Sequence, residues 1–149
     1  MLFIGRTGGA TNNHWVKGVS VAITPVRAIA VTEFTSTGSA AVVDDVLQVT
    51  QLANSQSGEA YVSIPRLLST DGIIVRYQMY TGDGTGADGQ CVNIGANDMG
   101  GRNGEDGVAV GVALCFDEYA NSDAEHGIQI FYNAEMVFEG RATCENQGG

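Results

Sequence analysis

Proline and basic residues are scarce in this chain, and no apolar run is long. Two prolines and seven lysines plus arginines occur among 149 residues, against 17 aspartates plus glutamates, which gives a net charge of −10. Basic residues so few and so scattered cannot form a cationic track, so nucleic acids and anionic membranes are not expected as partners. The longest apolar stretch, residues 107–116, is too short to cross a bilayer, which argues against membrane insertion.

Helical periodicity is also missing, because no segment keeps apolar residues at i, i+3 and i+4 over three turns. The 21 glycines lie in turn-like clusters between short runs that alternate with period two. This pattern predicts an all-β protein, a two-sheet antiparallel sandwich or jelly roll with helices absent or very short. The predicted strands are residues 19–24, 40–50, 60–64, 73–80, 90–94, 108–116, 127–132 and 135–138, with a turn at Asn133.

The acidic excess and the cysteines each leave two interpretations open. Acidity suits a cation-binding protein, or it serves only solubility. The three cysteines, Cys91, Cys115 and Cys144, suit one disulfide plus a remaining thiol in an oxidising compartment, or three free cytosolic thiols. No secretion signal is recognisable at the N-terminus, so a secreted protein would have lost it or would carry it upstream of this fragment.

One loop gathers oxygen donors directly after a predicted strand. Asp117, Asn121, Asp123 and Glu125 fall within nine residues, followed by His126. Calcium binds six to eight oxygen ligands in flexible geometry, which a loop can supply. Acidic loops at strand ends are also common as merely solvated segments, so spacing alone does not decide between the two.

The sequence of this loop resembles the metal-binding loop of L-type (legume-like) lectins. The letters FDEYAN, followed shortly by an acid and HGI, have the family's order of strand, Asp, aromatic, Asn, acid and His. The resemblance implies a calcium site formed by the side chains of Asp117 and Asn121, the backbone carbonyl of Tyr119, and Asp123 or Glu125 as the second acid. It also implies the family's concanavalin-like jelly roll.

A second stretch, Ala87-Asp88-Gly89 before the strand at 90–94, resembles the family's sugar-binding loop. The resemblance implies that Asp88 accepts hydrogen bonds from sugar hydroxyls and that the Ala87–Asp88 peptide is cis. It further implies that Gly100 and Gly101 donate backbone N–H groups to the ligand and that Asn121 contacts both ion and sugar. Three aromatic residues are candidates for stacking on a sugar ring, although sheet aromatics more often belong to the core: Tyr80, Tyr119 and Phe138.

The chain departs from the family in two places. The loop from Asn121 to His126 is several residues shorter than in legume lectins, and Cys115 replaces the glutamate that binds a transition metal there. Calcium without manganese is therefore expected, and His126 is interpreted as a hydrogen-bonding loop residue. The resemblance would place Cys91 beside Cys115 on neighbouring strands as a disulfide; two separate buried thiols are the alternative.

The two ends of the chain suggest an unusual order of elements. Residues 1–24 resemble the closing strands of a lectin-like unit, whereas residues 31–149 resemble a lectin-like jelly roll that is truncated at its C-terminus. A fragment of a tandem-repeat protein, a circular permutation in which the N-terminal hairpin completes the sandwich, and strand donation by a neighbouring chain would each explain this. Cys144 would then find its partner beyond Gly149 or in another chain.

These observations predict a secreted or cell-surface module that binds glycans or glycoproteins with calcium. The alternative is a structural unit of an extracellular filament, adhesin or coat, with self-association or strand exchange between subunits. An enzyme is not expected: retaining glycosidases of this architecture need two carboxyl groups about 5 Å apart. The E-x-D-x-x-E run that supplies them in such folds does not occur in the sequence.

Overall fold

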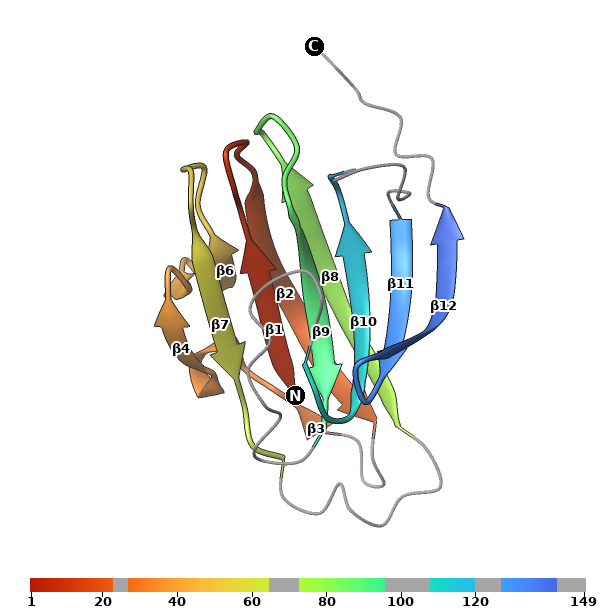
Figure 1. Ribbon diagram of the computed structural model, residues 1–149. Coiled ribbons are helices and arrows are strands. Elements are labelled where there is room, and N and C mark those ends of the chain that lie inside the picture. The colour runs from red at the N-terminus through yellow and green to blue at the C-terminus, as the bar shows by residue number, and fades with distance from the viewer. Residues whose placement is uncertain (23–26, 65–72, 96–107, 120–126, 142–149) are drawn as a thin grey trace.

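The protein is an antiparallel sandwich of two β-sheets (Figure 1). The computed structural model describes residues 1–22, 27–64, 73–95, 108–119 and 127–141. Its elements are β1 (Leu2–Arg6), β2 (Asn13–Ala22), β3 (Arg27–Ala28), the 3₁₀ turn η1 (Val31–Glu33), β4 (Thr35–Gly38), β5 (Ala41–Val43), β6 (Val46–Thr50), β7 (Ser57–Tyr61), β8 (Ile74–Gly82), β9 (Gly89–Ile94), β10 (Val112–Asp117), β11 (Gly127–Tyr132) and β12 (Glu135–Arg141).

The first sheet has seven strands in the order β12-β11-β10-β9-β1-β7-β4. The second has five, with β3, β2, β6 and β5 in a row and β8 paired along the other side of β2. The expectation of an all-β, two-sheet antiparallel sandwich is thus confirmed. Among the described residues, η1 is the only helical turn, and no helix there is long and apolar enough to span a membrane.

Most predicted strands are present with shifted ends, and one is divided. The strand predicted at 127–132 has those bounds in the structure, and the turn after it places Asn133 and Ala134 at positive φ. The single strand predicted at 40–50 is wrong, because β5 and β6 form a hairpin there. Asp44 and Asp45 adopt φ values of 49° and 59°, the left-handed conformation that a tight hairpin turn needs and that aspartate tolerates.

The N-terminal strands belong to different sheets, so they do not pair with each other as a hairpin. β1 lies between β7 and β9 in the first sheet, whereas β2 lies beside β6 and β8 in the second. The intervening residues 7–12 cross from one layer to the other. Because β1 is central, its side chains are buried on both faces of the sheet from Leu2 to Ile4.

The main core fills the space between the sheets. Phe3 on β1 packs against Phe34 and Tyr77, with ring centroids 5.8 and 5.2 Å apart. Val16 and Leu47 face it from the second sheet and are fully buried. Burial of this apolar surface is the principal stabilising term and positions the strand ends that form the candidate site.

Candidate functional site

Three chain segments meet at one rim of the first sheet. Arg6 at the end of β1, Gly89 at the start of β9 and Asp117 at the end of β10 are aligned across adjacent strands. In Figure 1 this rim is at the top, where β1 and β10 end and β9 begins. Asp88 comes directly before Gly89, and Tyr119 comes two residues after Asp117. Both residues therefore lie in loops that leave the sheet at this rim.

The loop after β1 is held by backbone and hydroxyl hydrogen bonds. Thr7 is buried, and its hydroxyl donates to the Ala53 carbonyl at 2.7 Å while accepting from the Gln56 N–H at 3.0 Å. The Ser55 N–H donates to the Gly8 carbonyl at 3.0 Å. These contacts hold Gly8 and Gly9 in a defined position, although the two glycines have no side chains to anchor them.

The same loop is also joined to the loop that precedes β9. The Thr85 N–H donates to the Thr11 carbonyl at 2.7 Å, and the Thr11 N–H donates to the Thr85 hydroxyl at 3.0 Å. The loops approach so closely at Gly84 that a Cβ there would lie 1.8 Å from the Thr11 carbonyl oxygen. Glycine at this position is therefore required for the two loops to meet.

Asp88 occupies the centre of the rim. Its N–H donates to the Arg6 carbonyl and its carbonyl accepts from the Glu118 N–H, both at 2.9 Å, so its backbone bridges the loops after β1 and β10. The Ala87–Asp88 peptide bond is cis, as the resemblance to L-type lectins implied. The carboxylate is 14 % exposed, and its Oδ2 lies 3.7 Å from Arg6 Nε.

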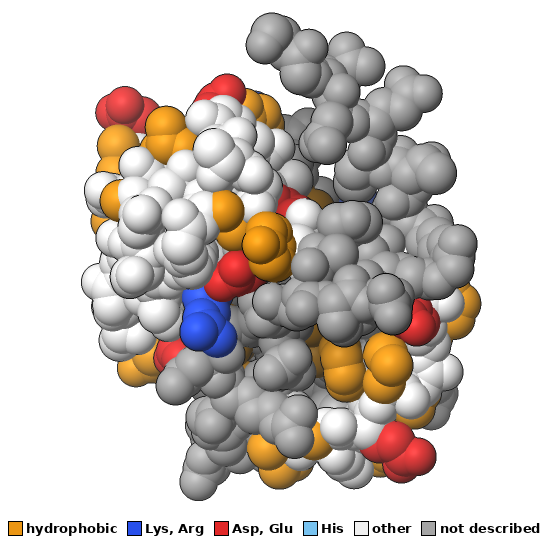
Figure 2. All heavy atoms as spheres, turned by 45° about the horizontal axis from the view of Figure 1, so that its top comes forward, with side chains coloured by type: hydrophobic (Ala, Val, Ile, Leu, Met, Phe, Trp, Pro, Cys, Tyr) orange, Lys and Arg blue, Asp and Glu red, His pale blue; other side chains and the backbone are white. Residues whose placement is uncertain are grey.

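A hollow of about 440 Å³ opens beside this carboxylate. Figure 2, which turns this end of the molecule toward the viewer, shows one prominent basic group on this face beside acidic and apolar side chains. A Cβ at Gly8 would lie 3.3 Å from both Asp88 carboxylate oxygens, so glycine leaves this side of the carboxylate uncovered. The hollow is lined by Arg6, Gly8, Gly9, Ala10, Ala87, Asp88 and Tyr119.

Of the predicted calcium ligands, the structure describes Asp117 and Tyr119. Asp117 Oδ1 accepts a hydrogen bond from the Tyr119 N–H at 3.0 Å, which turns the chain sharply after β10. The remaining predicted ligands Asn121, Asp123 and Glu125, and the predicted sugar contacts Gly100 and Gly101, lie outside the described residues. Within the described residues, no group of three or more His, Cys, Asp or Glu side chains is arranged to hold a metal ion.

Glu118, between those two residues, points the opposite way, into the space between the sheets. Its carboxylate accepts hydrogen bonds from the Asn12 amide and the Thr81 hydroxyl, and it lies 3.5 Å from His14 Nε2. The His14 ring is fully buried, with Nδ1 2.6 Å from the Thr50 hydroxyl. This cluster joins the end of β10 to β2, β6 and β8 directly beneath the rim.

Neither this cluster nor the lining residues Arg6, Gly8 and Gly9 are predictable from the sequence pattern. Its members are single polar residues in strands or turns far apart in the sequence, and nothing in their local pattern distinguishes them from solvent-facing residues. Only the packing of β2 under the rim brings them together. Of the three aromatic candidates, Tyr119 lines the hollow, whereas Tyr80 stacks on Trp15 with ring centroids 4.7 Å apart.

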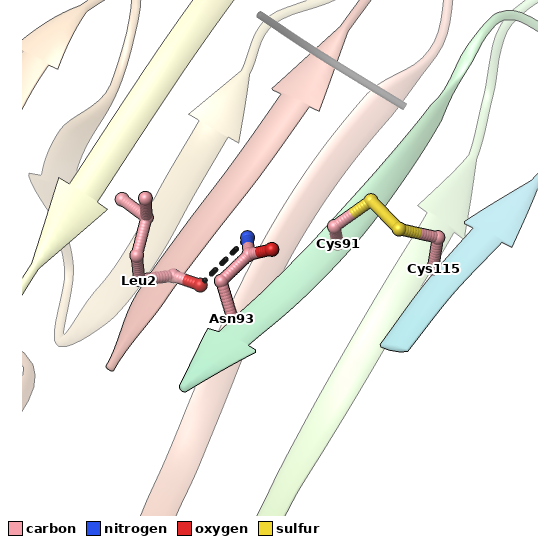
Figure 3. Close-up of a disulfide and its surroundings, with 4 residues drawn as sticks. All are labelled: Leu2, Cys91, Asn93 and Cys115. Carbon is pink, nitrogen blue, oxygen red and sulfur yellow. Dashed lines mark hydrogen bonds between the residues drawn. A yellow bond between two sulfur atoms is a disulfide. The ribbon is translucent and has the colours of Figure 1, made fainter. Parts of the chain in front are cut away.

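Directly below Asp88, the predicted disulfide between Cys91 and Cys115 is confirmed (Figure 3). The two residues are opposite each other in the β9–β10 pairing, with Cα atoms 4.0 Å apart. Both are buried, in a small cluster with Ala113 and Phe131. The bond joins the two strands whose ends carry Asp88 and Asp117, and it is compatible with an oxidising compartment.

No protein-family model, curated protein or solved structure matches this chain. The rim combines a mostly buried carboxylate, a neighbouring guanidinium, uncovered glycine backbone and one exposed aromatic ring. Such a set offers both acceptors and donors to a polar ligand and one flat apolar surface.

Proposed function

We propose that this chain is an extracellular, calcium-dependent carbohydrate-binding module of the L-type lectin kind. The observation that carries the proposal is the position of the Asp88 carboxylate at the wall of the rim hollow, with its open side toward Gly8 and Gly9. A carboxylate held by its backbone on both sides is preorganised as an acceptor, and charge-assisted hydrogen bonds are stronger than neutral ones.

A sugar presents adjacent hydroxyl groups on one side and C–H groups on its ring faces. Two hydroxyls would donate to the two oxygens of Asp88, while the Arg6 guanidinium and the backbone of Gly8 and Gly9 offer polar contacts around them. Tyr119 is 43 % exposed and lines the same hollow, so it is available to pack against the ring. Glycine suits this wall because a side chain at Gly8 would press on the carboxylate.

The described donors match the chemistry of calcium but form only part of a coordination shell. Asp117 and Tyr119 offer a carboxylate and a backbone carbonyl, both hard oxygen ligands, next to the Asp88 loop. The proposal assigns the rest of the shell to Asn121 and to Asp123 or Glu125. Calcium bound there would neutralise acidic groups at the rim and hold the Asp88 and Asp117 loops together.

The proposal places the protein outside the cytoplasm, as a secreted or surface-bound glycan receptor. The supporting feature is the buried disulfide, because such bonds persist mainly in oxidising compartments. Glycans and glycoproteins are the corresponding partners.

The test compares two carboxylates of one loop. Asp88→Asn removes the charge at the hollow, whereas Asp83→Asn removes an exposed charge five residues earlier, at a φ of 66° that asparagine tolerates. Glycan-array binding with calcium, followed by calorimetry on the best ligand, should show a loss of about 10- to 100-fold for Asp88→Asn because charge-assisted bonds are lost. Asp83→Asn should bind like the wild type.

Removal of calcium with a chelator should lower wild-type affinity, and Asp117→Asn should weaken calcium binding measured without any sugar. The proposal fails if the folded wild-type protein retains no glycan in the presence of calcium. It also fails if Asp88→Asn binds as tightly as Asp83→Asn.

A further inference from the structure

A row of polar side chains crosses the inner face of the second sheet beneath the rim. His14 on β2 is aligned with Thr50 on β6 and with Thr81 on β8, so the three side chains are neighbours on adjacent strands. His14 and Thr50 are fully buried. Buried polar groups are costly unless they are hydrogen-bonded, so this row requires partners between the two sheets.

The imidazole ring of His14 is held on one side and open on the other. Its Nδ1 lies 2.6 Å from the Thr50 hydroxyl oxygen, and a Cβ at Gly5 on β1 would lie 3.3 Å from the same nitrogen. Its Nε2 has no hydrogen-bond partner among the described residues, and it faces the Glu118 carboxylate at 3.5 Å. The ring is therefore fixed between the two sheets, with its open nitrogen directed at Glu118.

Glu118 reaches this row from the first sheet, one residue after β10 ends. Its carboxylate accepts hydrogen bonds from the Asn12 amide and the Thr81 hydroxyl, and the Asn12 amide also donates to the Thr81 hydroxyl at 2.9 Å. The Glu118 side chain is only 13 % exposed, so these donors replace much of the water that a carboxylate would otherwise bind. The side chain is thereby anchored to β8 and to the residue that precedes β2.

The backbone of Glu118 belongs to the rim itself. The aligned pairs of β9 and β10 end with Gly89 and Asp117. The next link between the two loops is the hydrogen bond from the Glu118 N–H to the Asp88 carbonyl, at 2.9 Å. Glu118 also lies between Asp117 and Tyr119 in the chain, so its place determines where these two neighbours leave the sheet. One residue thus joins the second sheet to both loops of the rim.

We propose that Glu118 is the positioning residue of the rim hollow: its side chain is anchored in the second sheet, and its backbone holds Asp88 and Tyr119 at the spacing that a bound sugar requires. The inference rests on the proposed function for its ligand. Asp88 and Tyr119 line the hollow, whereas Glu118 is not among the described residues that do so. Because preorganised groups bind more tightly than mobile ones, loss of the anchor should weaken binding without removing any group that contacts the sugar.

Asn93 provides a matched control for a role in stability alone. It is a fully buried polar residue of β9, and it lies four residues along the strand from Gly89, a distance of about 13 Å from the rim. Its amide donates to the Leu2 carbonyl at 3.3 Å (Figure 3). Asn93→Ala therefore removes a buried hydrogen bond, as Glu118→Ala does, but far from the hollow.

The first measurement is residue-resolved amide hydrogen exchange of the 149-residue chain without any ligand. Rates are expressed relative to the amides of β1, which report on unfolding of the whole sandwich. In Glu118→Ala, the amides of residues 88 and 118 should exchange about tenfold faster or more, because two hydrogen bonds to a charged group are lost. Glu118→Gln keeps the length of the side chain and an oxygen acceptor, so its rates should stay within about threefold of the wild type. Asn93→Ala should leave both amides unchanged on the same relative scale.

The second measurement is calorimetric binding, in the presence of calcium, of the glycan that the wild type retains on an array. Glu118→Ala should weaken this binding by about tenfold or more, and Glu118→Gln should largely preserve it. Asn93→Ala should lower the free energy of unfolding in urea but leave the glycan affinity unchanged. If Glu118→Ala does not fold, Thr81→Val replaces it in both measurements: it keeps the shape of the side chain, removes one donor to the carboxylate, and should accelerate exchange of the same two amides.

Unchanged relative exchange at residues 88 and 118 overturns the inference, because the anchor then does not hold the loops. Glycan binding that Asn93→Ala weakens as much as Glu118→Ala overturns it as well, since affinity then follows overall stability. A wild-type chain that retains no glycan refutes the proposed function instead, and the exchange comparison still decides whether Glu118 positions the loops.

Discussion

Loss of the Cys91–Cys115 disulfide should lower the free energy of unfolding by a predictable amount. The two cysteines are separated by 24 residues, and closing a loop of that length restricts the unfolded chain by about 3.5 kcal/mol in the loop-entropy model. Each Cys→Ala substitution also removes a buried sulfur, about 1 kcal/mol of apolar burial. Cys115→Ala should thus cost about 4.5 kcal/mol, and the double variant Cys91→Ala/Cys115→Ala about 5.5 kcal/mol.

The measurement is urea unfolding at equilibrium, followed by circular dichroism. All proteins, including the reference, carry Cys144→Ala, so that no third thiol exchanges with the bond. The difference between the single and double variants isolates the packing contribution of one sulfur, and the remainder of the single variant's loss is the crosslink contribution. Reducing the disulfide in the reference protein should reproduce that remainder without any change in sequence.

The reasoning is refuted if the crosslink contribution falls below about 1.5 kcal/mol. Loop closure in the unfolded state would then be a minor effect, and β9 and β10 would be held together by their ladder hydrogen bonds and packing alone. The reasoning is also refuted if adding Cys91→Ala to Cys115→Ala lowers the free energy of unfolding by as much as Cys115→Ala alone, because the first substitution already removes the crosslink.

Two further changes test other parts of the fold. Burial raises the pKa of Tyr77 to about 12, so between about pH 10 and pH 12 the unfolded chain releases this proton while the folded chain keeps it. The free energy of unfolding should therefore fall by about 2–3 kcal/mol over that range, and Tyr77→Phe should remove most of this fall. Urea titrations of both proteins at matched pH measure it. An equal dependence of the free energy of unfolding on pH in the two proteins would contradict this explanation. Gly58→Ala would place a Cβ 1.8 Å from the Val49 carbonyl oxygen and should destabilise the protein by at least about 2 kcal/mol. The control Gly9→Ala, whose Cβ would have no atom within 4 Å, should change thermal stability little. Equal losses of stability in the two variants would show that the close approach at Gly58 does not cause the loss.

The strand pattern was predictable where alternation and turn chemistry agree. Residues 127–132 alternate between the two faces and end at Asn133, and the structure has that strand with those bounds. Residues 40–50 were predicted as one strand because apolar residues occur on both sides of Asp44-Asp45. The turn there depends on a left-handed conformation that aspartate adopts only in some contexts, so the local sequence does not decide it.

The candidate site was predictable in part, through its resemblance to a family motif. The motif placed Asp88 and Asp117 in neighbouring loops and Cys91 beside Cys115, and the structure confirms the disulfide. Arg6 and Gly8 did not stand out, because they come from the N-terminal strand, whose place in the first sheet was not predicted. The bonds of Glu118 to Asn12 and Thr81 likewise depend on the second sheet lying beneath the rim.

By itself, the sequence determined the class of the fold and the chemistry available to it: an acidic, glycine-rich, all-β chain with oxygen donors at its loop ends. These properties follow from side-chain alternation, turn propensity and charge, all of which act over a few residues. Tertiary structure alone decided that β1 lies beside β9, that Gly8 faces Asp88, and that Glu118 reaches Asn12 and Thr81. Such contacts join residues dozens of positions apart, and they form only when burial of the common core selects one arrangement of strands.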